Sequence, residues 1–471
     1  MIIRLVEPAA PGLHVYSKVR LPRLGLPIMG AVLKAHGHDV SIHAGEVKPI
    51  DWEDVYRADL VGFSTTSSTV PEAYEHADEL RRRGIPVVIG GSHVTFLADE
   101  ALEHVDYVAR GEGGEELILE LIEALQGDRA LESIRGLSFR RDGQIVHNPL
   151  RDPVADLDSL PFPDLTLIHG HERMTQTPIM TSWGCPFDCR FCSVTAMFGK
   201  KFRFRSTESI IAEIEQTRAP KIFFYDDNMA ANRNRLKELL QMMIDRKLDV
   251  SWSAQVRTDV ARDPELLELM SRSGCWNVFL GLESVNQDTL DSYDKAQSVD
   301  DIVRAIDRLH DYGISSHGMF VLGADSDGPD AVRDTVSFAV KHKIDTVMLN
   351  ILTPLPGTPL YHELDDEGRI FDKDWQHYDA LHVVYTPRQM TPYHLQKETI
   401  RGYARFYGLR RWLGCLFTFR FAKLIFQTWG YAITRAWRRD EGNRSFMRAL
   451  KRLHLPAGPG TQMHRTPVDS Q

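Results

Sequence analysis

The 471-residue sequence has few cysteines and no long uncharged apolar run. Three of its five cysteines lie within eight positions, a distribution unlike the disulfide framework of a small secreted protein. Because no stretch of about 20 uncharged apolar residues occurs, we expect no transmembrane helix. The opening run, residues 1–7, includes Arg4 and lacks the long apolar region of a secretory signal. These absences favour a reducing cytoplasm.

Acidic residues outnumber basic ones. Lys and Arg number 56 against 65 Asp and Glu, and the formal charge of −9 argues against a general nucleic-acid binder. The apolar content of 43% is ordinary for a globular protein, so most of the chain should fold. A chain of this length exceeds the size of one hydrophobic core, which predicts two or three domains.

The fold class predicted from the strand and helix pattern is α/β. Residues 1–150 should form a Rossmann-like domain, because apolar strand-like runs alternate with helix-like segments up to about Gly127. Small residues follow its strands, where ligands bind in open α/β sheets. They serve either as simple turns or as a cofactor-binding edge. They are Ser64, Thr65, Thr66, Gly90, Gly91, Gly111, Glu112 and Gly113.

A linker is expected over residues 151–175, within a polar, irregular stretch from about 128 to 173. A second alternation over 176–387 predicts six strands in a partial (β/α)6 barrel, with an active site at the C-terminal strand ends. Residues 388–471 are helical, basic and aromatic, with a frayed tail from 456 onward.

Cys185, Cys189 and Cys192 follow the first strand of this predicted barrel with the spacing C-x3-C-x2-C. Thiolates are the usual ligands of iron–sulfur clusters, and three of them leave one iron of a cubane open. The alternative is zinc, which is normally held by four protein ligands. No fourth ligand is spaced nearby, although His169 and His171 upstream are available in principle.

This cysteine pattern closely resembles the motif of the radical S-adenosylmethionine superfamily, including the aromatic Phe191 before the third cysteine. The resemblance implies that the three cysteines hold a 4Fe-4S cluster and that S-adenosylmethionine chelates its open iron. It further implies reductive cleavage to a 5'-deoxyadenosyl radical, with electrons from a donor such as flavodoxin or ferredoxin. Phe191 would flank the adenine; otherwise it only packs the loop.

The resemblance extends to polar residues at later strand ends. Asp226 and Asp227 stand where relatives place a polar group on the methionyl amine, although Asp227 could instead belong to a helix N-cap. Gln255 and Arg257 end the next strand, and Arg257 suits a carboxylate. Glu283 matches the position that contacts the ribose hydroxyls. No role is assigned to His317, Tyr225 and Tyr293.

Three upstream segments resemble the cobalamin-binding domain that precedes the barrel in one radical S-adenosylmethionine subclass. They are residues 21–30, residues 90–93, which end in His93, and residues 111–113. The resemblance implies cobalamin at the strand-end residues listed above and at His93. The Asp-x-His-x-x-Gly pattern is missing, so a bound cobalamin should lack a histidine as its lower ligand.

The leading functional prediction is cobalamin-dependent methylation of an unactivated carbon in a hydrophobic or lipid-like substrate. The runner-up is a cobalamin-independent cyclisation, oxidation or carbon–carbon coupling. A non-catalytic iron–sulfur redox sensor explains the cysteines but not the ordered strand-end residues Asp226, Arg257 and Glu283.

Residues 410–455 mix bulky apolar residues with arginines and lysines. A basic, aromatic amphipathic helix is typical of a membrane interface and would place the protein peripherally on a membrane. The alternative is a helix that covers the open barrel and exposes its basic face to water.

Overall fold

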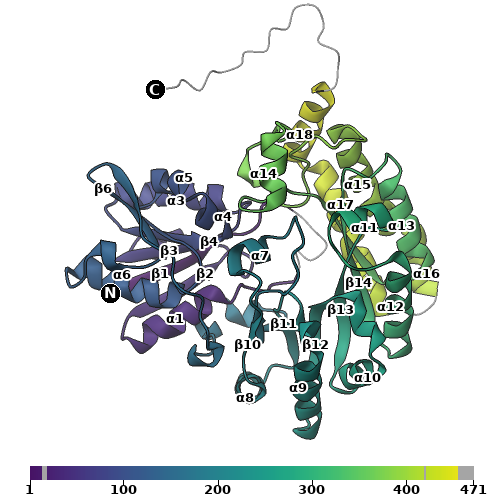
Figure 1. Cartoon of the computed structure of the whole chain (residues 1–471), viewed down its shortest axis with the longest axis horizontal. Helices are drawn as coiled ribbons and strands as arrows, with labels where there is room; N and C mark the ends of the chain where they lie inside the picture. Colours follow the sequence, from purple (N-terminus) through teal and green to yellow (C-terminus); the bar gives the residue numbers. More distant parts are fainter. Residues whose placement is uncertain (13–18, 418–420, 454–471) are drawn as a thin grey trace, which may run out of the picture.

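A computed structural model describes residues 1–12, 19–417 and 421–453. The expected frayed tail and parts of the 410–455 region, including residues 418–420, lie outside the described residues. Figure 1 shows an N-terminal α/β domain in purple and blue beside a curved sheet in teal and green, with the C-terminal helices in green and yellow.

The N-terminal domain is built on a seven-stranded sheet of order β2-β1-β3-β4-β5-β6-β7. The first five strands along the chain are parallel, and the parallel core explains their nearly continuous apolar runs. The strands are β1 (Ile2–Glu7), β2 (Asp39–Ala44), β3 (Leu60–Thr65), β4 (Val87–Gly91), β5 (Tyr107–Ala109), β6 (Leu137–Arg141) and β7 (Gln144–His147). The helices are α1 (Gly25–Ala35), α2 (Trp52–Val55), α3 (Val70–Arg82), α4 (Ser92–Phe96), α5 (Ala98–His104) and α6 (Gly114–Gln126).

One part of this sheet differs from the sequence-based expectation. The stretch expected to be irregular after residue 128 contains the hairpin β6–β7, which extends the sheet antiparallel to β5. Only Leu137, Ser138 and Phe139 of the hairpin are buried, so its apolar pattern is too short to stand out in the sequence. The segment after the hairpin returns to the domain, because Ile168 bridges Ile42 of β2.

The predicted barrel is a six-stranded parallel sheet of order β15-β14-β13-β12-β11-β8, open between its two edge strands. Its strands are β8 (Thr177–Ile179), β11 (Lys221–Phe224), β12 (Ser251–Val256), β13 (Cys275–Glu283), β14 (Ser315–Leu322) and β15 (Thr346–Ile351). A separate antiparallel pair, β9 (Ser182–Trp183) and β10 (Arg203–Phe204), flanks the cysteine loop. The helices are α7 (Ser193–Phe198), α8 (Thr207–Thr217), α9 (Arg233–Asp245), α10 (Pro264–Arg272), α11 (Gln287–Ser292), α12 (Val299–Asp311), α13 (Ala331–Lys341) and α14 (Pro359–Asp366).

The C-terminal helices are α15 (Pro392–Phe406), α16 (Leu409–Phe417), α17 (Phe421–Arg439) and α18 (Glu441–Arg452). Helix α15 covers the open edge of the barrel sheet at β15. The backbone N–H of Leu349 donates to the Tyr403 hydroxyl at 2.8 Å, and that of Val347 donates to the Tyr407 hydroxyl at 2.9 Å. These hydroxyls satisfy edge groups that would otherwise be free to pair with another chain.

Candidate active site between the two sheets

The three clustered cysteines lie together in the loop between β9 and α7, with free thiols. The N–H of Cys192, which directly precedes α7, donates to the carbonyl of Cys189 at 3.0 Å. Burial raises the pKa of Cys185 and raises that of Cys192 to about 11. A metal centre that binds these sulfurs as thiolates must therefore displace protons when it binds.

The spacing of these thiols argues against a single zinc ion. Zn–S bonds of about 2.3 Å would bring the sulfurs within about 4 Å of one another. Among the described residues, only a histidine–aspartate group brings three ligand atoms within 4.8 Å of one another, and the cysteines do not. The three sulfurs lie farther apart than ligands of one zinc ion would, and this wider spacing fits the larger iron–sulfur cubane.

Asp226 positions the start of the cysteine loop. Its carboxylate accepts hydrogen bonds from the N–H groups of Thr181 and Ser182 at 2.7 and 2.8 Å, and from the Thr181 hydroxyl at 2.5 Å. Burial raises the pKa of Asp226, while these donors oppose the shift. Both oxygens are engaged, so Asp226 is better suited to hold the loop than to bind a methionyl amine.

Asp227 lines a cavity between the two sheets. Its side chain is exposed at that cavity, while desolvation by the nearby protein together with the neighbouring Asp226 raises its pKa to about 7. It has no hydrogen-bond partner among the described residues. The N-cap alternative does not hold for α9, because the side chain of Asn232 caps that helix by accepting from the N–H of Arg235.

Arg257 and Glu283 meet at Lys295. The Arg257 guanidinium donates to the carbonyl of Lys295, and the Lys295 ammonium pairs with Glu283 at 2.5 Å. Arg257 also stacks 3.9 Å from the ring centre of Phe187, which lies within the cysteine loop. Gln255 makes a long, 3.5 Å bond to the carbonyl of Asp226. These contacts tie the ends of β12 and β13 to the loop and to one another.

Glu283 has a left-handed backbone, with φ at +59°. This conformation costs a non-glycine residue about 1–2 kcal/mol, and such strain clusters at functional sites. The strain lies where strand β13 shifts its register against β14.

A small cavity of about 80 Å³ lies beside the cysteine loop. Phe191 packs edge-on against Tyr293 there, with ring centres 4.9 Å apart. The buried hydroxyl of Tyr293 has no hydrogen-bond partner among the described residues. An aromatic slot with one unpaired donor fits a nucleoside base, so these residues fit the adenosyl part of S-adenosylmethionine.

The cavity between the two sheets, about 320 Å³, is bounded by strand ends of both sheets. Of the nine strand-end residues predicted for cobalamin, six line it: Ser64, Gly90, Gly91, Gly111, Glu112 and Gly113. From the barrel side, Trp183, Phe198 and Tyr225 contribute aromatic walls, and burial raises the pKa of Tyr225 to about 12. The apolar, glycine-lined wall fits a flat macrocycle such as the corrin ring.

Three of the predicted residues lie elsewhere. Thr65 is fully buried, and its hydroxyl donates to the carbonyl of Gly90, while Thr66 bonds to Thr69. His93 is buried between Ser67 and Glu100, at 3.1 and 3.2 Å from their side-chain oxygens. No histidine is among the described residues that line the cavity.

The contact that joins the two domains at this cavity has no signature in the sequence. Arg203 of β10 forms a two-pronged ion pair with Glu112, both bonds 2.6 Å, and the side chains are 10% and 5% exposed. Arg203 also donates to the carbonyl of Val154. No spacing links residues 91 positions apart, so only the fold reveals the pair.

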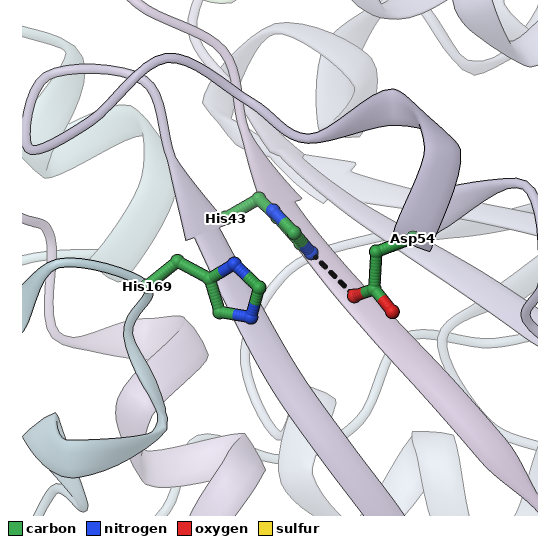
Figure 2. Close-up of side chains that lie close together, drawn as sticks. All are labelled: His43, Asp54 and His169. Atoms are coloured by element: carbon green, nitrogen blue, oxygen red, sulfur yellow. Dashed lines mark hydrogen bonds and ion pairs between the residues drawn. The ribbon is translucent and has the colours of Figure 1, made fainter.

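A second group of residues that could hold a metal ion, His43, Asp54 and His169, lies at β2 (Figure 2). One Asp54 oxygen already lies 2.8 Å from the Arg4 Nε and 3.0 Å from the His43 Nε2. The other His43 nitrogen accepts from the N–H of Asp51 at 3.4 Å. The Arg4 cation neutralises this carboxylate, so we interpret the group as a structural network.

Comparison with known proteins agrees with this site. A model described as the radical SAM superfamily matches residues 179–339, and one described as the B12 binding domain matches residues 13–119. Bacteriochlorophyllide d C-12(1)-methyltransferase of Chlorobaculum tepidum is 30% identical over 77% of this chain and 78% of that protein. The chain therefore belongs to the radical S-adenosylmethionine enzymes that carry a B12-binding domain.

Two other relatives extend the similarity. An uncharacterized methyltransferase of Pyrococcus horikoshii is 29% identical over 88% of this chain and 93% of that protein. Hopanoid C-3 methylase of Methylococcus capsulatus is 27% identical over 81% of this chain and 76% of that protein. As a member of this family, the chain is a radical S-adenosylmethionine enzyme of the methyltransferase type. The cofactors of the family are a 4Fe-4S cluster, S-adenosylmethionine and cobalamin.

Solved structures share the fold. The structure of OxsB with aqua-cobalamin bound superposes with a TM-score of 0.68 at 16% identity, covering 96% of this chain and 75% of that one. TsrM from Kitasatospora setae, with cobalamin and a [4Fe-4S] cluster bound, superposes with a TM-score of 0.64 at 18% identity. The match covers 78% of this chain and 75% of that one. The predicted fold class, α/β with a partial barrel after a Rossmann-like domain, is confirmed.

Proposed function

We propose that the protein methylates an unactivated carbon of a hydrophobic substrate. The proposal rests on one cavity, which is lined by strand ends of the B12-binding domain on one side and by barrel residues on the other. A substrate in this cavity would lie between the two cofactor-binding edges. Several walls are apolar, including Met29, Phe63 and Phe198, which favours a hydrophobic guest.

The site residues have distinct proposed tasks. Cys185, Cys189 and Cys192 hold the cluster, and Phe191 packs beside the adenosyl group. When bound, the cofactors supply a 5'-deoxyadenosyl radical and a methyl group. Asp227, which is unpartnered among the described residues, offers its carboxylate to the ammonium of S-adenosylmethionine, the charge pairing that a partly enclosed site favours.

The remaining predicted residues support this arrangement rather than touch the substrate. Asp226 fixes the loop that carries the cysteines, and Gln255 contacts its backbone. Arg257 and Glu283 stay our candidates for the carboxylate and ribose of S-adenosylmethionine, with Lys295 holding both in place. Radical initiation also needs an external electron donor, for which we propose a flavodoxin or ferredoxin.

A lipid-like substrate is favoured by the relatives and by the C-terminal surface. One relative is named for a bacteriochlorophyllide and another for a hopanoid. Leu413, Ile425 and Tyr431 of α16 and α17 are exposed, at 37%, 51% and 43%. No helix among the described residues is long and apolar enough to cross a membrane. We propose that residues 410–455 contact a membrane surface peripherally.

Anaerobic reconstitution tests the proposal. The purified protein should contain cobalt and a 4Fe-4S cluster, and it should form 5'-deoxyadenosine when reduced with S-adenosylmethionine. Absence of cobalt and of corrinoid absorbance would exclude the methyl-transfer version and leave cyclisation, oxidation or coupling. Failure to form 5'-deoxyadenosine with an intact cluster would instead support the redox-sensor alternative.

A further inference from the structure

A basic groove of about 420 Å³ lies between α15, α17 and α18, outside the cofactor cavity. None of its described lining residues is acidic, although the whole chain carries a formal charge of −9. Its cations are Lys397, Arg401, Arg438, Arg444 and Arg448. This concentration of one charge sign is the reverse of the chain's average.

Three of these cations have no carboxylate partner. Lys397, Arg438 and Arg444 form no ion pair within the part of the chain that the structure describes. Arg401 pairs with Glu398 at 2.6 Å, and Arg448 lies only at the 4.0 Å limit from Glu441. Like charges held in one groove repel each other, and an anion placed among them would offset that repulsion.

A buried donor in the groove wall is also unpaired. Trp437 is 5% exposed and lines the groove, and its indole N–H has no acceptor among the described residues. Leaving such a donor unsatisfied costs about 1–3 kcal/mol. The cost points to an acceptor that the protein itself does not provide.

We propose that this groove binds the phosphate group of an anionic ligand. Arginine guanidinium groups match phosphate oxygens in a two-pronged geometry, and four arginines line this groove. Tyr393, Ile400 and Met447 give the groove an apolar side for the rest of the ligand. The phosphate can come from the headgroup of a membrane lipid or from a soluble phosphate ester.

Two binding measurements on the cofactor-loaded, full-length protein distinguish these sources. Isothermal titration with pyrophosphate measures binding of a soluble phosphate, and co-sedimentation compares phosphatidylglycerol with phosphatidylcholine vesicles. The double variant R438Q/R444Q should bind pyrophosphate at least about tenfold more weakly. The control R272Q/R333Q removes two exposed arginines from α10 and α13 and should bind like the unmodified protein.

The variant W437F keeps an aromatic ring and removes the indole donor, so its pyrophosphate affinity should fall several-fold while far-UV circular dichroism shows that the protein stays folded. If the protein binds phosphatidylglycerol vesicles and pyrophosphate releases it from them, the site takes a lipid headgroup. If the protein binds pyrophosphate but not the vesicles, the site takes a soluble phosphate ester. No saturable binding of either, or equal affinity in R438Q/R444Q and the control, would overturn the proposal. Formation of 5'-deoxyadenosine should be unchanged in all variants, which separates this proposal from methyl transfer.

Discussion

Two adjacent aspartates show how the site divides its tasks between single residues. Asp226 points into the protein and is saturated by hydrogen bonds from Thr181 and Ser182, so it acts by positioning the loop. Asp227 faces the cavity and has no partner in the described structure. The sequence predicts a carboxylate at this strand end, but only the hydrogen bonds show which of the two is available to a ligand.

The cluster ligands give the first prediction. The C192A variant should lose most of its iron and sulfide after reconstitution, because the cubane would keep only two of its three thiolates. Cys275 provides the matched control, since it is 6% exposed in strand β13 and belongs to the hydrophobic core. C275A should retain its iron, measured by metal analysis and the visible absorbance of the cluster. Equal iron in both variants would contradict the assignment.

At the scale of elements, helix α15 stabilises the open edge of the barrel sheet. The Tyr407 hydroxyl accepts from the N–H of Val347 and donates to its carbonyl at 2.8 Å. Y407F should lower the free energy of unfolding by about 1–3 kcal/mol, because it leaves buried backbone groups unpaired. The control Y431F, at an exposed tyrosine of α17, should change it by less than about 0.5 kcal/mol. If α15 did not stabilise this edge, chemical denaturation would give equal changes in unfolding free energy for Y407F and Y431F.

Helix α18 is joined to the barrel through His382. Its two ring nitrogens lie 2.9 Å from an Asp379 carboxylate oxygen and 2.8 Å from the Asn443 side-chain oxygen. Burial alone would lower the pKa of His382. The hydrogen bonds to Asp379 and Asn443, together with the negative charges of Asp379 and Asp372, outweigh burial and raise the pKa above 6.5. The rings of His377, Trp437 and Phe446 surround it.

A raised histidine pKa has a defined consequence for stability. The stabilisation is fully present below the unfolded-state pKa of about 6.5 and is lost as the pH rises through the higher folded-state value. H382Q should therefore cost most stability near about pH 6 and less near about pH 8.5. Unfolding free energies at both pH values test this, and a cost that does not vary with pH would show that the pKa of His382 is the same in the folded and the unfolded protein.

The main elements could be predicted from the sequence, because apolar runs such as β13 and amphipathic helices such as α12 carry strong local patterns. The β6–β7 hairpin could not, since it buries too few residues to produce one. Cys185, Cys189 and Cys192 are local in sequence and were predicted together. The roles of Lys295 and Trp437 depend on distant partners, which no spacing in the chain encodes.

At the scale of the whole molecule, the Glu112–Arg203 pair connects the two domains at the edge of the cavity. Breaking a buried ion pair by removing one charge typically costs about 3–5 kcal/mol. E112Q should loosen the β9–β10 hairpin against the B12-binding domain, so that more 5'-deoxyadenosine forms per methylated product. The control E116Q alters a carboxylate whose side chain is 78% exposed and should keep the normal ratio. An unchanged ratio in E112Q would show that the pair only stabilises the fold.

The central claim is that the chain transfers an intact methyl group to a carbon of a hydrophobic molecule. The most direct test feeds trideuteromethyl methionine to cells that express either the native chain or C192A, and compares their extracted lipids and pigments by mass spectrometry. We predict a hydrophobic product, present only with the native chain, that carries all the deuterium of one labelled methyl group. A product that depends on the native chain but carries no labelled methyl group would contradict the claim.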